Sequence, residues 1–205
     1  MTHRSIYYGV LALCLIAAPA LAISSIPAKE KLRAMVVAVQ SLSYSGKLVY
    51  QRADVLANLA FQHDVIDGQE RARLRRLSGK PLERAQLGGS LVKAVPGPNV
   101  LRQGYPLPGI INTEPHKIFD APYQITLGEE ERIADRSSDL VLVEATDAHR
   151  HSYKFWIDSE TSLLLKSQTL DVEGRTLEQF EFSELSIGPQ TVEIAAGNES
   201  FQVNV

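Results

Sequence analysis

Polar and apolar residues alternate along much of this chain, and the alternation is clearest between Tyr153 and Leu185. Successive side chains of an extended chain point to opposite faces, so the pattern predicts three antiparallel strands with one apolar face. Residues 158–162 and Asp171–Gly174 separate the strands and are rich in turn-forming side chains, with Gly174 suited to a positive φ. This stretch therefore predicts a three-stranded meander.

The apolar face of this meander is assigned strand by strand. In the first strand it holds Tyr153, Phe155 and Ile157, whereas Trp156 falls on the polar face. In the second strand Lys166 and Gln168 mark the outer face, which leaves Leu163 and Leu165 for the inner one. The third strand places Phe180 and Phe182 together. A sheet with one apolar face must bury it against another layer.

The rest of the chain supplies that layer and more strands. Leu32, Met35, Val36 and Val39 recur at helical spacing, which predicts one amphipathic helix over Pro27–Gln40. From Tyr44 the period changes to two, and Asp67-Gly68 is a hairpin signal. Strands are expected near Tyr44–Arg52, Leu59–Val65, Glu70–Ser78, Leu82–Leu87, Leu91–Val95, Tyr123–Leu127 with a continuation to Ile133, and Leu140–Thr146.

Six of the ten prolines lie between Pro96 and Pro122. Proline excludes a central strand or a long helix, so this segment is expected to be a crossing loop or lid. About ten strands, one helix and one long loop predict a mainly β protein of the α+β class. Its strongly curved antiparallel sheet would wrap around the helix and form a half-barrel able to hold an apolar ligand.

Residues 1–22 have the pattern of a signal peptide. His3 and Arg4 precede an uncharged apolar run from Tyr7 to Ala18, and Ala20 and Ala22 are the small residues that a signal peptidase prefers. We expect cleavage after Ala22 and export to the periplasm. A transmembrane anchor is less favoured, because the run is shorter than the roughly 20 residues that span a bilayer.

Cleavage would also remove Cys14, the one cysteine, so the mature chain would contain no disulfide. It would keep 20 of the 21 Lys and Arg residues against 24 Asp and Glu, a net charge of about −4. An acidic balance argues against nucleic-acid binding. Arg71, Arg73 and Arg75 would share one face of a strand, and a solvated outer face is favoured there over a binding patch.

Candidate chemistry is sparse, and we expect neither catalysis nor a cofactor. The chain has no nucleophile elbow, P-loop, dinucleotide fingerprint or zincin motif. His149 and His151 could supply two metal ligands, but solvated turn residues are favoured and no metal site is expected. His63 on an apolar strand face is expected to be a wall residue with a hydrogen-bond partner.

Several ordered blocks resemble the MucB/RseB family of periplasmic regulators of envelope stress. The most specific runs from Leu163 to Gln168 and continues through the Asp171–Gly174 turn to Leu177–Phe180. The similarity covers about Lys29–Gly188. The other similar blocks are Tyr44–Arg52, Arg73–Gly79, Gly128–Asp135 and Tyr153–Asp158.

This resemblance implies the unclosed β-barrel of lipoprotein carriers of the LolA/LolB type, with helices on its concave side. It also implies binding to the periplasmic segment of a transmembrane anti-sigma factor, protection of that factor from proteolysis, and release linked to lipid or lipopolysaccharide. Residues 23–188 would form the large N-terminal domain of the family. Residues 189–205 would be a tail, with the family's usual small second domain absent.

The apolar face suggests which residues would line a lipid cavity. Plain packing of these side chains against the helix is an equally good interpretation, because both uses need the same apolar face. Two other functions stay open: a periplasmic lipid or lipoprotein carrier, and an accessory module without an anti-sigma partner. The candidate cavity residues are Leu48, Tyr50, Leu59, Phe61, Ile125, Leu127, Val141, Val143, Phe155 and Ile157.

Overall fold

The computed structural model describes residues 25–88, 90–95 and 122–189. The predicted signal peptide, nearly all of the proline-rich segment and the tail after residue 189 lie outside these ranges. Within them the chain forms one helix and ten strands. These are α1 (Ser25–Ser41), β1 (Tyr44–Arg52), β2 (Val55–Ile66), β3 (Gln69–Arg76), β4 (Glu83–Leu87), β5 (Ser90–Val95), β6 (Tyr123–Ile133), β7 (Arg136–Ala145), β8 (Ser152–Asp158), β9 (Leu164–Leu170) and β10 (Thr176–Ile187).

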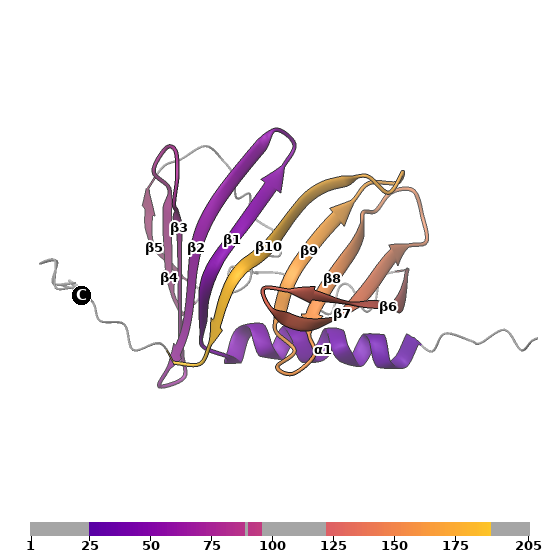
Figure 1. Ribbon diagram of the computed structural model, residues 1–205, viewed down its shortest axis with the longest axis horizontal. Coiled ribbons are helices and arrows are strands. Elements are labelled where there is room, and N and C mark those ends of the chain that lie inside the picture. The colour runs from indigo at the N-terminus through magenta and orange to yellow at the C-terminus, as the bar shows by residue number, and fades with distance from the viewer. Residues whose placement is uncertain (1–24, 89, 96–121, 190–205) are drawn as a thin grey trace, which may run out of the picture.

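All ten strands belong to one antiparallel sheet in the order β5-β4-β3-β2-β1-β10-β9-β8-β7-β6. Each half of this order is a meander of consecutive strands, and the two halves meet where β1 pairs with β10. Figure 1 shows the strongly curved sheet with α1 running across its lower end. The two outer strands, β5 and β6, do not pair with each other, so the barrel is unclosed. The predicted fold class is confirmed.

The helix packs its apolar stripe into the main core. Ala28, Leu32, Met35 and Val39 are buried there among side chains of the sheet, as the helical spacing predicts. Lys31 pairs with Asp139 of β7 and so ties the helix to the second meander. In the part of the chain that the structure describes, no helix has the length and apolar character needed to cross a membrane.

Two of the predicted hairpin turns have the backbone that their residues favour. Asp67 and Gly68 both have positive φ, at 51° and 73°, which matches the turn type preferred between twisted antiparallel strands. Gly174 has a φ of 79° in the turn between β9 and β10. Glycine occupies this left-handed region without steric cost.

A smaller cluster covers the outer face of the second meander. It contains Trp156, Ile133, Leu140 and Leu165. Trp156 therefore lies opposite the main core, as predicted, and the Lys166 ammonium sits 4.6 Å from its ring centroid.

The prediction that Leu165 faces inward is wrong. The register between β8 and β9 shifts between Trp156 and Ile157, so that Trp156 pairs with Lys166 and Ile157 pairs with Leu164. This bulge leaves Leu165 as an extra residue, which joins Trp156 on the outer face, while Leu164 packs in the main core. The alternation of polar and apolar residues in the sequence does not show where such a bulge lies.

The pairing of β1 with β10 requires close approach of two backbones. A Cβ atom on Gly46 would lie 2.1 Å from the carbonyl oxygen of Glu184. The register of this ladder also shifts between Lys47 and Leu48, one residue further along β1. Gly46 therefore lets the two meanders join beside a bulge.

We predict that Gly46→Ala lowers the free energy of unfolding by more than about 3 kcal/mol, because the added methyl group meets backbone atoms that cannot rotate away. Gly174→Ala is the matched control, since Gly174 has positive φ but no atom within 4 Å of the added Cβ. It should cost about 1 kcal/mol. Urea unfolding followed by circular dichroism measures both, and equal losses would contradict the close-approach argument.

Candidate functional site

The candidate cavity residues lie almost entirely in the main core. Nine of the ten are at most 2% exposed, and they belong to one cluster together with the apolar stripe of α1. Leu127 is different, because 39% of it is exposed on the outermost strand β6, although it pairs with the buried Val141. The set therefore shares one face of the sheet, as predicted. Its role as a ligand cavity stays a prediction.

A carboxyl group lies at the edge of this core. Glu178 of β10 is 6% exposed, and one of its carboxyl oxygens, Oε1, accepts a hydrogen bond from the hydroxyl of Tyr50 on β1. Its other oxygen, Oε2, is buried without a hydrogen-bond partner among the described residues. An ionised carboxylate in such a place loses hydration without full compensation.

Burial raises the pKa of Glu178 to about 7, while the Tyr50 hydrogen bond and the positive charge of Arg52 act in the opposite direction. The group therefore carries a proton through mildly acidic conditions and loses it near neutrality. Glu178 is not among the candidate residues predicted from the sequence. The signal was present, however, because Glu178, Phe180 and Phe182 alternate along β10 and are all buried.

His63 is a wall residue with both ring nitrogens satisfied. It is fully buried, with Nδ1 2.8 Å from the carbonyl oxygen of Leu42 and Nε2 3.0 Å from Oε1 of Glu70. The first contact links β2 to the residue that follows α1, and the second links β2 to β3. The prediction of a satisfied structural histidine is confirmed.

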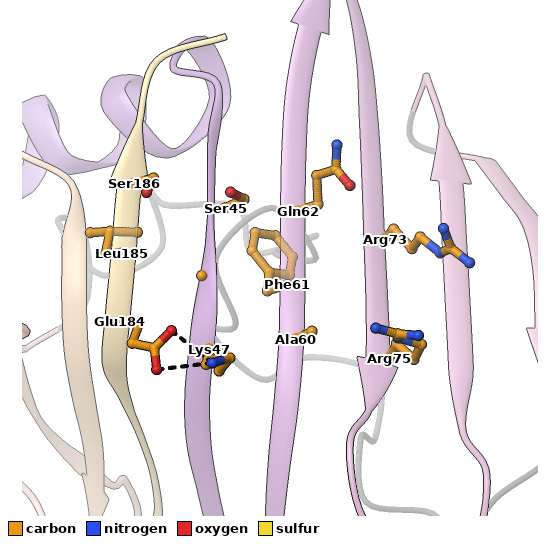
Figure 2. A pocket seen from close by; sticks show the side chains of 11 residues that line it. Ser45, Lys47, Ala60, Phe61, Gln62, Arg73, Arg75, Glu184, Leu185 and Ser186 are labelled. Atoms are coloured by element: carbon orange, nitrogen blue, oxygen red, sulfur yellow. Dashed lines mark hydrogen bonds and ion pairs between the residues drawn. The ribbon is translucent and has the colours of Figure 1, made fainter. Parts of the chain in front are cut away.

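The outer face of the first meander carries a groove of about 440 Å³ that crosses β10, β1, β2 and β3. Figure 2 shows the Lys47–Glu184 ion pair on one side of Ala60 and Gln62, with Arg73 and Arg75 on the other. The groove is lined by Ser45, Gly46, Lys47, Ala60, Phe61, Gln62, Arg73, Arg75, Glu184, Leu185 and Ser186. Only Phe61 comes from the candidate cavity set, so this groove is a separate feature.

A second groove of about 440 Å³ lies at the turn between β7 and β8 and at the turn after β9. Its wall includes the exposed Asp147–Arg150 ion pair and Asp171, which accepts hydrogen bonds from Arg175. His149 and His151 flank Arg150 and are exposed, as expected of solvated turn residues. No group of three or more metal-ligating side chains occurs in the described part of the chain.

Comparison with known proteins gives a consistent result. Residues 27–201 match the model of the MucB/RseB N-terminal domain family. The sigma-E factor regulatory protein RseB of Salmonella typhimurium is 36% identical over 156 residues, which cover 73% of this chain and 48% of RseB. The sigma factor AlgU regulatory protein MucB of Pseudomonas aeruginosa is 29% identical over 175 residues, covering 84% of this chain and 55% of MucB. The chain spans about half the length of these relatives.

Two solved structures share the fold over most of the chain. A crystal structure of MucB superposes with a TM-score of 0.73 at 26% identity, covering 85% of this chain and 64% of that one. A crystal structure of MucB in complex with MucA(peri) gives a TM-score of 0.69 at 28% identity, covering 81% of this chain and 57% of that one. The fold likeness extends across the described core.

We predict that the free energy of unfolding falls as pH rises from about 4.5 to 7. In this range Glu178 is still protonated in the folded state, whereas the same carboxyl group has lost its proton in the unfolded chain. The loss should be on the order of 3 kcal/mol. Glu178→Gln should remove this component, since the amide stays neutral. Glu144→Gln, at an exposed position, is the control and should leave the pH profile unchanged. Urea unfolding at several pH values measures the effect, and parallel profiles for the parent and Glu178→Gln would contradict it.

Proposed function

Because the chain belongs to the family of MucB/RseB N-terminal domains, we propose that it is a periplasmic regulatory protein that acts by binding rather than by catalysis. Its partner is the periplasmic segment of a transmembrane anti-sigma factor, which it shields from proteolysis. The observation that carries this proposal is the likeness to MucB in its complex with MucA(peri), over 81% of this chain.

The same proposal includes a second ligand, an acyl chain of a lipid or lipopolysaccharide. The curved sheet presents a continuous apolar inner face against α1, and nine of the ten candidate residues contribute to it. If an acyl chain took the place of the α1 side chains on this face, the apolar surface of the sheet would stay buried against another apolar group. Lipid entry would then displace the anti-sigma segment.

Export is part of the proposal. Residues 1–22 form a signal peptide, cleavage after Ala22 leaves Ile23 as the first residue, and residues 23–188 form the binding domain. Mass spectrometry of the exported protein measures the new N-terminus. A mature form that retained residues 1–22 would contradict this assignment.

The alternative function is a periplasmic lipid or lipoprotein carrier, or an accessory lipid-binding module, that has no anti-sigma partner. The inner face favours it as much as the regulatory role, since both require an apolar surface. The two differ in whether a protein segment binds.

We predict that the exported chain binds the periplasmic segment of its anti-sigma factor in isothermal titration calorimetry, and that lipopolysaccharide weakens this binding. A segment of scrambled sequence is the control and should not bind. Extractable lipid without segment binding would replace the regulatory role with the carrier. Absence of both would overturn both functions and leave the inner face as packing alone.

A further inference from the structure

Three arginines form a regular row on the outer face of β3. Arg71, Arg73 and Arg75 are exposed, while Ala72 and Leu74 between them are buried on the inner face. Side chains two residues apart on one strand are separated by about 6.6–6.8 Å. The row therefore repeats positive charge at the spacing of an extended polypeptide.

The outer-face groove adjoins the row at Arg73 and Arg75, which are two of its lining residues. Ala60 and Gln62 of β2 lie directly opposite Arg75 and Arg73 in the strand register. On the next strand, Lys47 and Ser45 pair with the same two β2 residues. The small side chains of Ala60 and Ser45 leave a depression beside Arg73 and Arg75, and Figure 2 shows the Lys47–Glu184 pair on its other side.

The charges around the row are only partly balanced. Glu83 of β4 holds Arg73, with Oε1 2.8 Å from Nε and 2.7 Å from a terminal nitrogen. Among the residues that the structure describes, Arg71 and Arg75 form no hydrogen bond or ion pair. Asp64 stands opposite Arg71 in the strand register and accepts a hydrogen bond from Gln62, and Glu184 pairs with Lys47.

We propose that this arginine row and the adjoining groove bind an extended acidic peptide segment with Asp or Glu at alternate positions. A chain in β conformation presents alternate side chains on one side at the spacing of the three arginines, so each carboxylate meets one guanidinium. Gln62 and the hydroxyls of Ser45 and Ser186 line the groove where they can hydrogen-bond the bound chain.

The shape of the site selects this occupant over a single phosphate group. One phosphate is held by one or two guanidinium groups and gains nothing from a third at a distance of two repeats. Leu87, 38% exposed, stands opposite Arg71, and Ile66, 47% exposed, stands opposite Gln69, so both offer apolar contact to the end of a longer segment. The inference stands apart from the proposed function, since it concerns the outer face.

The test uses the whole exported chain and two labelled peptides of the same composition, each containing three Glu and several Thr. In one peptide the Glu residues alternate with Thr, and in the other they are consecutive. Fluorescence anisotropy should show at least about fivefold tighter binding of the alternating peptide, with binding weakened by added salt.

A triple variant, Arg71→Gln with Arg73→Gln and Arg75→Gln, should lose at least about tenfold in affinity for the alternating peptide. The matched control, Arg132→Gln with Arg150→Gln and Arg175→Gln, removes three positive charges from exposed positions in or next to hairpin turns and should stay within about twofold. Circular dichroism and the Tm confirm that both variants are folded.

Equal binding of the two peptides would overturn the proposal, because the spacing would then be irrelevant. Equal losses in the two triple variants would also overturn it, since net charge alone would account for binding. Displacement of the peptide by an equal concentration of inorganic phosphate would replace the peptide with a simple anion. This test does not use the anti-sigma segment. A negative result would therefore count against the arginine-row proposal alone and not against the proposed function.

Discussion

The pairing of β1 with β10 is the constraint on which the whole fold depends. The other eight strand pairings join neighbours in sequence and could form within one meander or the other. The β1–β10 ladder joins residues 44–52 to residues 178–187, so its formation must overcome the entropy of closing a long loop. Once formed, it merges two apolar faces into one core that also takes in α1. Both the close approach at Gly46 and the Tyr50–Glu178 contact lie on this ladder.

Much of this fold could be predicted from the sequence because its signals are local. Alternation, helical spacing and the Asp67-Gly68 turn each act within a few residues, and the helix and the meanders follow from them. The bulge that turns Leu165 outward could not be predicted, because it depends on how β8 and β9 pair and not on either strand alone. The strand order was equally hidden, since no local pattern specifies that β1 meets β10.

The candidate site shows the same division. Sequence alternation placed nine side chains on the buried inner face, yet it did not distinguish a ligand cavity from packing, because both need the same apolar pattern. It placed Arg71, Arg73 and Arg75 together on an exposed face and favoured a solvated role. The groove beside them arises from the small residues on β1 and β2, which come into register only in the folded sheet.

The two faces of the sheet place different demands on a ligand. A ligand of the inner face must displace α1 side chains that already exclude water there, so its net gain is the difference between two apolar contacts. If such a ligand opened the sheet near Tyr50, water would reach Glu178 and reduce the desolvation penalty on its ionised form. Ligand entry would then be coupled to proton release from Glu178. A ligand of the outer face meets exposed guanidinium groups and displaces only solvent and weak surface ion pairs. A ligand bound on that face would therefore leave the core intact.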